Sequence, residues 1–86
     1  MAGQDNILKL SQFPHKTRGV ILGYENENLK MPAKIIEMGL LPDTEFIILY
    51  QAPFHGPLYI EFGAEKSRIA LRQEEAEYIS AALLTA

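Results

Sequence analysis

Apolar and polar residues alternate along much of this chain with the two-residue period of β-strands. The clearest run is 58–62, in which every second residue is apolar and would lie on one face of a sheet. Residues 68–72 and 78–84 alternate similarly, and although alanines in the second run favour helix, we expect it to be a closing strand. Residues 18–24 and 45–51 are rich in β-favouring residues, and the nearly continuous apolar run 45–51 suits a strand that is buried on both faces or central in a barrel.

Three shorter segments have helical features instead. Apolar residues recur at nearly helical spacing over 7–13, which predicts one helical turn that ends at Pro14. Residues 32–39 begin with proline and end with glycine, as a short helix of about two turns often does. The acidic run 73–77 predicts a further helical turn. The inward-facing residues of the central helix are expected to be Ile35, Ile36 and Leu40.

These elements predict a mostly β domain, a small barrel of about five strands with one or two short helices. The chain has 86 residues, of which 48% are hydrophobic, and this is enough for a single core. We therefore expect a flexible N-terminus at residues 1–6 and one domain over residues 7–86.

Composition narrows the classes of function. The net charge is −3 and no basic block is present, so nucleic acid is not an expected partner. The sequence contains no cysteine, which removes disulfides, thiolate metal ligands and thiol nucleophiles. The N-terminus does not resemble a signal peptide, and no apolar run approaches the roughly 20 residues that cross a bilayer. We expect a cytoplasmic protein without direct membrane insertion.

The loop at residues 52–57 is the first candidate binding surface, because an aromatic residue between prolines can serve as a rigid apolar anchor. The alternative is that this aromatic side chain folds back and caps the barrel. The second candidate is the outer surface of the helix, although a methionine at helical spacing more often belongs to the core. The predicted contact residues are Pro53, Phe54 and His55 in the loop and Lys34, Glu37 and Met38 in the helix.

Catalytic and metal chemistry have weaker support. His15 and His55, with Asp43 or Glu61, are the available nitrogen and oxygen ligands, but their spacing is not that of a metal site. We therefore interpret both histidines as exposed loop residues. No Ser-His-Asp set or glycine-rich phosphate loop is present, so no enzymatic activity and no cofactor are expected. The acids Glu74, Glu75 and Glu77 are expected to form a solvated helix face, with Arg72 pairing to Glu75 or Glu77.

Residues 38–44, MGLLPDT, resemble the helix-end signature of the FeoA family, in which glycine and leucine precede a proline turn and the central strand. Similar stretches follow the same order at 18–21, 56–60 and 69–72, the last continuing with Glu75, Ala76 and Ile79. Two positions depart from the family pattern. Lys34 stands near the usual arginine, and Asp43 stands where glycine commonly follows the proline.

The resemblance implies an SH3-like barrel, a fold that also forms the C-terminal domain of iron-dependent repressors. It further implies a small accessory protein of ferrous iron transport, which binds the cytoplasmic GTPase region of the transporter and modulates uptake, as a monomer or weak homo-oligomer. Two alternatives remain open. One is a direct ferrous iron carrier or sensor, and the other is a generic SH3-like module that binds proline-rich peptides.

Overall fold

A computed structural model describes residues 7–25 and 30–84 of the chain. The expected flexible N-terminus, residues 1–6, and most of the polar turn after Tyr24 lie outside the described residues. The strands are β1 (Ile7–Lys9), β2 (Arg18–Tyr24), β3 (Glu45–Gln51), β4 (Leu58–Phe62), β5 (Ser67–Leu71) and β6 (Ile79–Leu83). The helices are a 3-10 turn (Leu10–Gln12), α1 (Lys30–Met38) and α2 (Gln73–Ala76).

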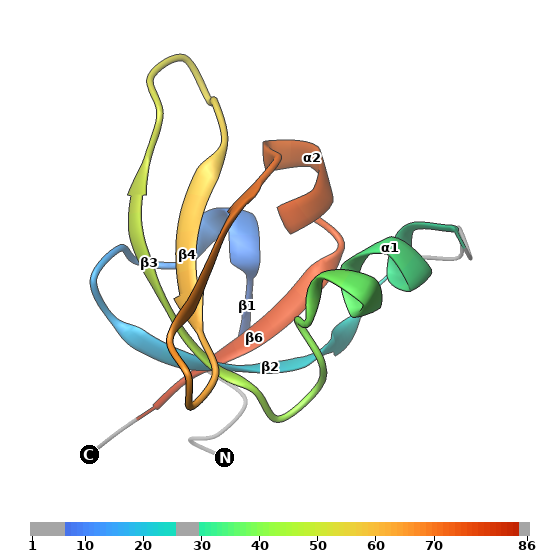
Figure 1. The fold of residues 1–86 in the computed structure, drawn as a ribbon. Coiled ribbons are helices and arrows are strands. Elements are labelled where there is room, and N and C mark those ends of the chain that lie inside the picture. Colours follow the sequence, from blue (N-terminus) through green and yellow to red (C-terminus); the bar gives the residue numbers. More distant parts are fainter. Residues whose placement is uncertain (1–6, 26–29, 85–86) are drawn as a thin grey trace.

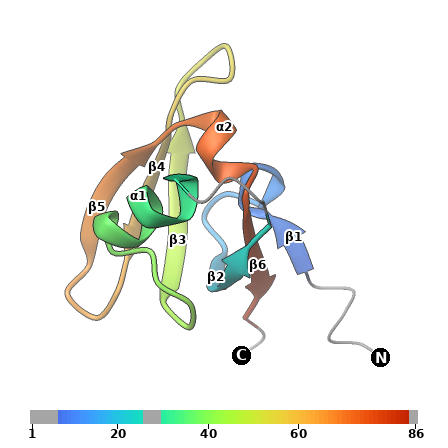
Figure 2. The same ribbon diagram turned by 90° about the vertical axis from the view of Figure 1, so that its right-hand side faces the viewer.

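The six described strands form one antiparallel sheet in the order β1-β6-β2-β3-β4-β5 (Figure 1). The sheet curves strongly around α1 and α2, as the turned view shows (Figure 2). Within the described residues no ladder joins the edge strands β1 and β5, so the barrel is not fully closed. The expectation of a mostly β, SH3-like fold with two short helices is confirmed, with one strand more than the sequence pattern predicted.

The core fills the concave side of this sheet. β4 contributes three buried side chains at alternate positions, as its two-residue period predicted. Facing β-strands and both helices supply the remaining apolar residues. The buried hydrophobic residues are Leu10, Phe13, Ile21, Ile35, Leu40, Phe46, Ile48, Leu58, Ile60, Phe62, Leu71, Ala76, Ile79 and Ala81.

The chain reversal after α1 is fixed by backbone hydrogen bonds. Gly39 has a φ of 102°, which a residue with a side chain rarely adopts, and its N–H donates to the Ile36 carbonyl at 2.9 Å. The N–H of Leu40 donates to the Ile35 carbonyl at 3.3 Å. The predicted glycine cap is therefore confirmed, and the helix begins at Lys30, two residues before Pro32.

Two local predictions are wrong. Residues 7–9 form strand β1, in which Ile7 lies opposite Ala82 of β6, and only residues 10–12 form the expected helical turn. In α1, Ile35 is buried but Ile36 is 43% exposed. The reason is geometric, because consecutive residues are about 100° apart around a helix and Met38 follows Ile35 on the inward side.

Candidate docking site

The hairpin of β3 and β4 extends beyond the rest of the sheet (Figure 1). The pairing of β3 with β2 ends at Ile47, whereas its pairing with β4 continues to Gln51 opposite Leu58. Residues 52–57, the loop predicted as a binding surface, therefore form the tip. We call residues 50–59 the hairpin arm.

The loop backbone is held by its own hydrogen bonds. Ala52 N–H donates to the Pro57 carbonyl at 2.9 Å, and Gly56 N–H lies 3.1 Å from the Ala52 carbonyl oxygen. Phe54 and His55 both adopt left-handed conformations, with φ of 61° and 57°. A tight turn with defined geometry follows from these constraints.

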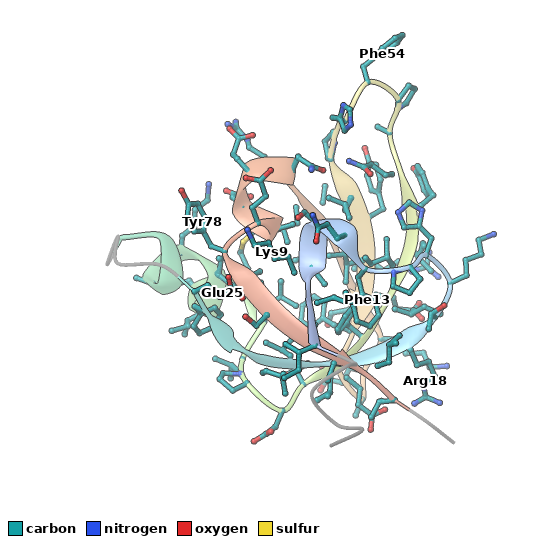
Figure 3. The ribbon with its side chains drawn as sticks, turned by 180° about the vertical axis from the view of Figure 1, so that it is seen from behind. Lys9, Phe13, Arg18, Glu25, Phe54 and Tyr78 are labelled. Carbon is teal, nitrogen blue, oxygen red and sulfur yellow. The ribbon has the colours of Figure 1, made fainter. Side chains whose placement is uncertain are left out.

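Phe54 points away from the domain (Figure 3), and its side chain is 98% exposed. The alternative in which this aromatic ring folds back to cap the barrel is therefore wrong. Because the ring makes no contact that stabilises the fold, it is available as an apolar anchor for a partner.

The base of the arm is built from residues that sequence reasoning did not single out. The Gln51 side-chain amide donates to the Gly56 carbonyl at 2.9 Å and to the Gln73 amide oxygen at 2.8 Å. Tyr50 and Tyr59, which are opposite each other across the strands, stack with ring centroids 4.5 Å apart. Two tyrosines placed on either side of a turn-forming loop were the available sequence signal for this stack. The hydrogen bond from Gln51 to Gln73 fixes the arm to the N-terminal end of α2.

Two of the three predicted contact residues in the helix, Lys34 and Met38, interact with other residues of the domain. Lys34 Nζ lies 2.6 Å from Glu75 Oε2, and the Glu75 side chain is only 4% exposed against 56% for Lys34. Glu75 is thus not part of a solvated helix face as predicted. Among the described residues Arg72 makes no side-chain ion pair; instead its backbone N–H donates to Glu75 Oε1 at 3.0 Å.

The charge of Glu75 is stabilised despite its burial. Burial by itself would raise the pKa of the carboxyl group, but the hydrogen bonds from Lys34 and the Arg72 N–H, with the positive charges of both residues, hold the pKa below its usual value. Glu75 is therefore ionised at neutral pH and links α2 to α1.

The two predicted surfaces are not continuous. α2 lies between them, because its Gln73 contacts the arm and its Glu75 contacts α1. In α1, Glu37 is exposed, whereas Met38 is half-buried and packs against the core. Pro53 and His55 are exposed beside Phe54.

The residues considered for metal binding do not converge. In residues 7–25 and 30–84, no group of three or more His, Asp or Glu side chains is placed to hold a metal ion. His15 lies before β2, and His55 lies at the tip of the arm. Across the same residues, no helix has the length and apolarity needed to span a bilayer.

A hollow of about 250 Å³ lies at the opposite end of β3 and β4 from the arm, beside the turn that joins β4 to β5. Its walls carry both signs of charge, including the ion pair of Arg18 with Glu45 at 2.6 Å. Because these charges largely neutralise each other, the hollow does not select a charged ligand.

Comparison with known proteins gives a consistent assignment. The FeoA domain family matches residues 8–82. No curated protein matches the chain. Among solved structures, a FeoA-like protein from Clostridium acetobutylicum is 26% identical, with a TM-score of 0.81 and coverage of 94% of this chain and 91% of that one.

Two further structures resemble this fold. One is FeoA of Stenotrophomonas maltophilia, solved with zinc and described as a prokaryotic SH3 domain protein and candidate activating factor of bacterial ferrous iron transport. It is 25% identical to this chain, with a TM-score of 0.68 over 84% of this chain and 86% of that one. A manganese-dependent transcriptional repressor shares the fold, with 16% identity and a TM-score of 0.82 over 91% of this chain and 37% of the repressor. The family match spans nearly the whole fold described above, and this chain belongs to the FeoA family.

Proposed function

We propose that this chain is a cytoplasmic, non-enzymatic accessory protein of ferrous iron transport that docks on the cytoplasmic GTPase region of the transporter and modulates uptake. Membership of the FeoA family supports the connection with ferrous iron transport. The structural observation that carries docking is Phe54, whose side chain is 98% exposed at the tip of a hydrogen-bonded hairpin.

The physical case for docking rests on the cost of this arrangement. An exposed phenylalanine loses the free energy that its burial would provide, which is about 1.5–3 kcal/mol for a large apolar side chain. A protein partner that buries the ring recovers that free energy, and aromatic anchors of this kind often dominate binding energy at interfaces.

The proposal is tested by titrating the purified GTPase region of the transporter from the same genome into the full chain. Isothermal calorimetry is done without nucleotide, with GDP and with a non-hydrolysable GTP analogue. We expect binding in at least one nucleotide state and weaker binding by Phe54→Ala. Absence of binding in all three conditions would refute the proposed function.

The helix surface needs a carefully chosen variant. Lys34→Glu would place a second carboxylate beside buried Glu75 and would disturb the fold, so loss of binding would not report docking. Glu37→Lys changes an exposed charge on the same helix and is the appropriate probe.

A further inference from the structure

We infer that the hairpin arm, and not α1, makes the central contact with the GTPase region, and that Phe54 enters an apolar socket on that partner whose α2-facing side is basic. This inference rests on the proposed function. The hairpin arm is then the binding element, and α1 has a structural role.

The first step concerns what residue 54 does for the fold. The Phe54 side chain is almost fully in solvent, so it contributes no packing to the core. Its φ of 61° would be adopted more easily by glycine or asparagine. Folding therefore gains nothing from phenylalanine at this position, whereas an apolar socket on a partner would.

The second step concerns rigidity. The Gln51 side chain, at the start of the loop, donates a hydrogen bond to the carbonyl of Gly56 near its end. It also donates a hydrogen bond to Gln73, which attaches the arm to α2. The backbone that carries the ring is thus ordered before the partner arrives, so little backbone conformational entropy is lost on binding. A preformed apolar projection of this kind fits a preformed pocket better than a flat or flexible surface.

The third step concerns charge. Glu74 directly follows Gln73, which contacts the arm. Glu74 on α2 and Glu77 just after the helix are both exposed, as is Arg72 just before it. The opposite flank of β3 carries Lys16, whose backbone N–H donates to the Ile48 carbonyl at 2.7 Å. The two exposed carboxylates exceed the single guanidinium, so the α2 side of the arm is acidic by one charge, and a socket with lysine or arginine on that side would be complementary.

The same charge distribution disfavours a lipid surface as the occupant. Anionic headgroups would be repelled by the exposed carboxylates of Glu74 and Glu77 and by the net charge of −3. Attraction to anionic lipids requires clustered lysine and arginine, and the exposed charges beside the arm at α2 are acidic by one charge.

The residues of α1 are less suited to a partner contact, because two of them are engaged within the domain. Lys34 is held by Glu75 at 2.6 Å, and Met38 packs against the core. Both residues thus keep α1 on the domain. Glu37 and Ile36, which is 43% exposed, are accessible on α1, but among the described side chains of this helix none is an exposed aromatic anchor comparable to Phe54.

The test measures the affinity of the full chain for the purified GTPase region at low and high salt. Phe54→Ser should raise Kd by about 30-fold or more, the loss typical of a central anchor. Glu74→Lys should raise Kd by roughly fivefold at low salt, and the difference should shrink at high salt because the attraction is screened. Amide NMR spectra of each variant confirm that the fold is retained.

Two matched controls accompany these variants. Glu65→Lys makes the same charge change in the turn at the far end of β4, and Leu41→Ser removes an exposed apolar side chain near the end of α1. Both controls, and Glu37→Lys, should change Kd by less than about twofold.

The outcomes separate the inference from the proposed function. If the wild type does not bind the GTPase region, the proposed function fails. If it binds and Phe54→Ser binds equally well, or Glu37→Lys weakens binding more than Phe54→Ser does, the inference alone is wrong. Sedimentation with phosphatidylcholine and phosphatidylglycerol vesicles, or dimer formation in analytical ultracentrifugation, would overturn it in favour of lipid or a second copy if either depended on Phe54.

Discussion

The ion pair between α1 and α2 gives a quantitative test of how this small domain is held together. Removing one partner of a fully buried ion pair typically costs about 3–5 kcal/mol, whereas a fully exposed pair is worth under about 1 kcal/mol. In this pair Glu75 is 4% exposed and Lys34 is 56% exposed. Water screens the lysine end, and the Arg72 N–H remains as a donor to the carboxylate.

Lys34→Met should therefore lower the free energy of unfolding by about 2 kcal/mol, between these two limits. Methionine keeps the length and much of the apolar stem of lysine and removes only the charged group. A loss of this size is large for a domain whose total stability is expected to be near 5 kcal/mol. The main cause is that the buried Glu75 carboxylate would lose its countercharge.

Urea denaturation followed by circular dichroism measures this loss at neutral pH. Lys9→Met on exposed β1 is the matched control and should change stability by less than about 0.5 kcal/mol. Glu75→Gln and the double variant complete a cycle, whose coupling free energy should be at least about 1 kcal/mol. Equal stabilities of the Lys34→Met and Lys9→Met variants would refute the reasoning.

The dependence on pH gives an independent check. Because the pKa of Glu75 is lower in the folded state than in the unfolded chain, its ionisation stabilises the fold at pH values above the unfolded pKa of about 4.3. This contribution is lost as pH falls through the lower, folded pKa. The stability gap between the wild type and Glu75→Gln should therefore narrow in acid, and a gap independent of pH would contradict the assignment.

Three further changes test other parts of the fold. Gly19→Ala should destabilise by about 1–3 kcal/mol in thermal unfolding, because its Cβ would overlap the buried ring of Phe13. Tyr24→Phe should cost about 1 kcal/mol in urea unfolding, because the Tyr24 hydroxyl donates to the Leu40 carbonyl at 2.5 Å. Burial also raises the pKa of Tyr24, so alkaline absorbance titration of the wild type should show a late-ionising tyrosine that this variant lacks. His55→Gly should raise the unfolding free energy by about 0.5–1 kcal/mol, because glycine adopts a φ of 57° without strain.

Most strands were predictable because apolar residues alternate with polar ones wherever one face of the strand is buried. In β4 every second side chain is buried, so the period of the sequence and the period of the structure coincide. Gly39 was equally informative, because a left-handed helix end strongly favours glycine. Such features depend only on residues close together in the sequence.

The prediction for residues 7–9 failed because their conformation is determined by pairing with a strand that is distant in the sequence. Their apolar spacing fits a helix, but Ile7, Leu8 and Lys9 pair with residues 80–82 of β6. Ladder hydrogen bonds to a strand at the other end of the chain outweigh a weak local preference. Periodicity within a short window contains no information about that partner.

The candidate site was only half predictable for the same reason. Composition identified the loop at residues 52–57, but the direction of Phe54 depends on how far the sheet extends beneath it. Glu75 looked like one of several solvated acids, and only the packing of α1 against α2 shows that it is buried and paired. Side chains that join separate elements cannot be inferred from their own neighbours in sequence.

The exposure of Phe54 follows from topology and not from a choice of side-chain rotamer. The β2–β3 ladder ends at Ile47, with one more bond from Lys16 to Ile48, and the β3–β4 ladder continues to Gln51 with β5 beside β4. Beyond that point the chain provides no described layer that a ring at position 54 could pack against, whichever staggered rotamer it adopts. The length of the hairpin, together with the aromatic residue at its tip, is therefore the feature that supports a docking role.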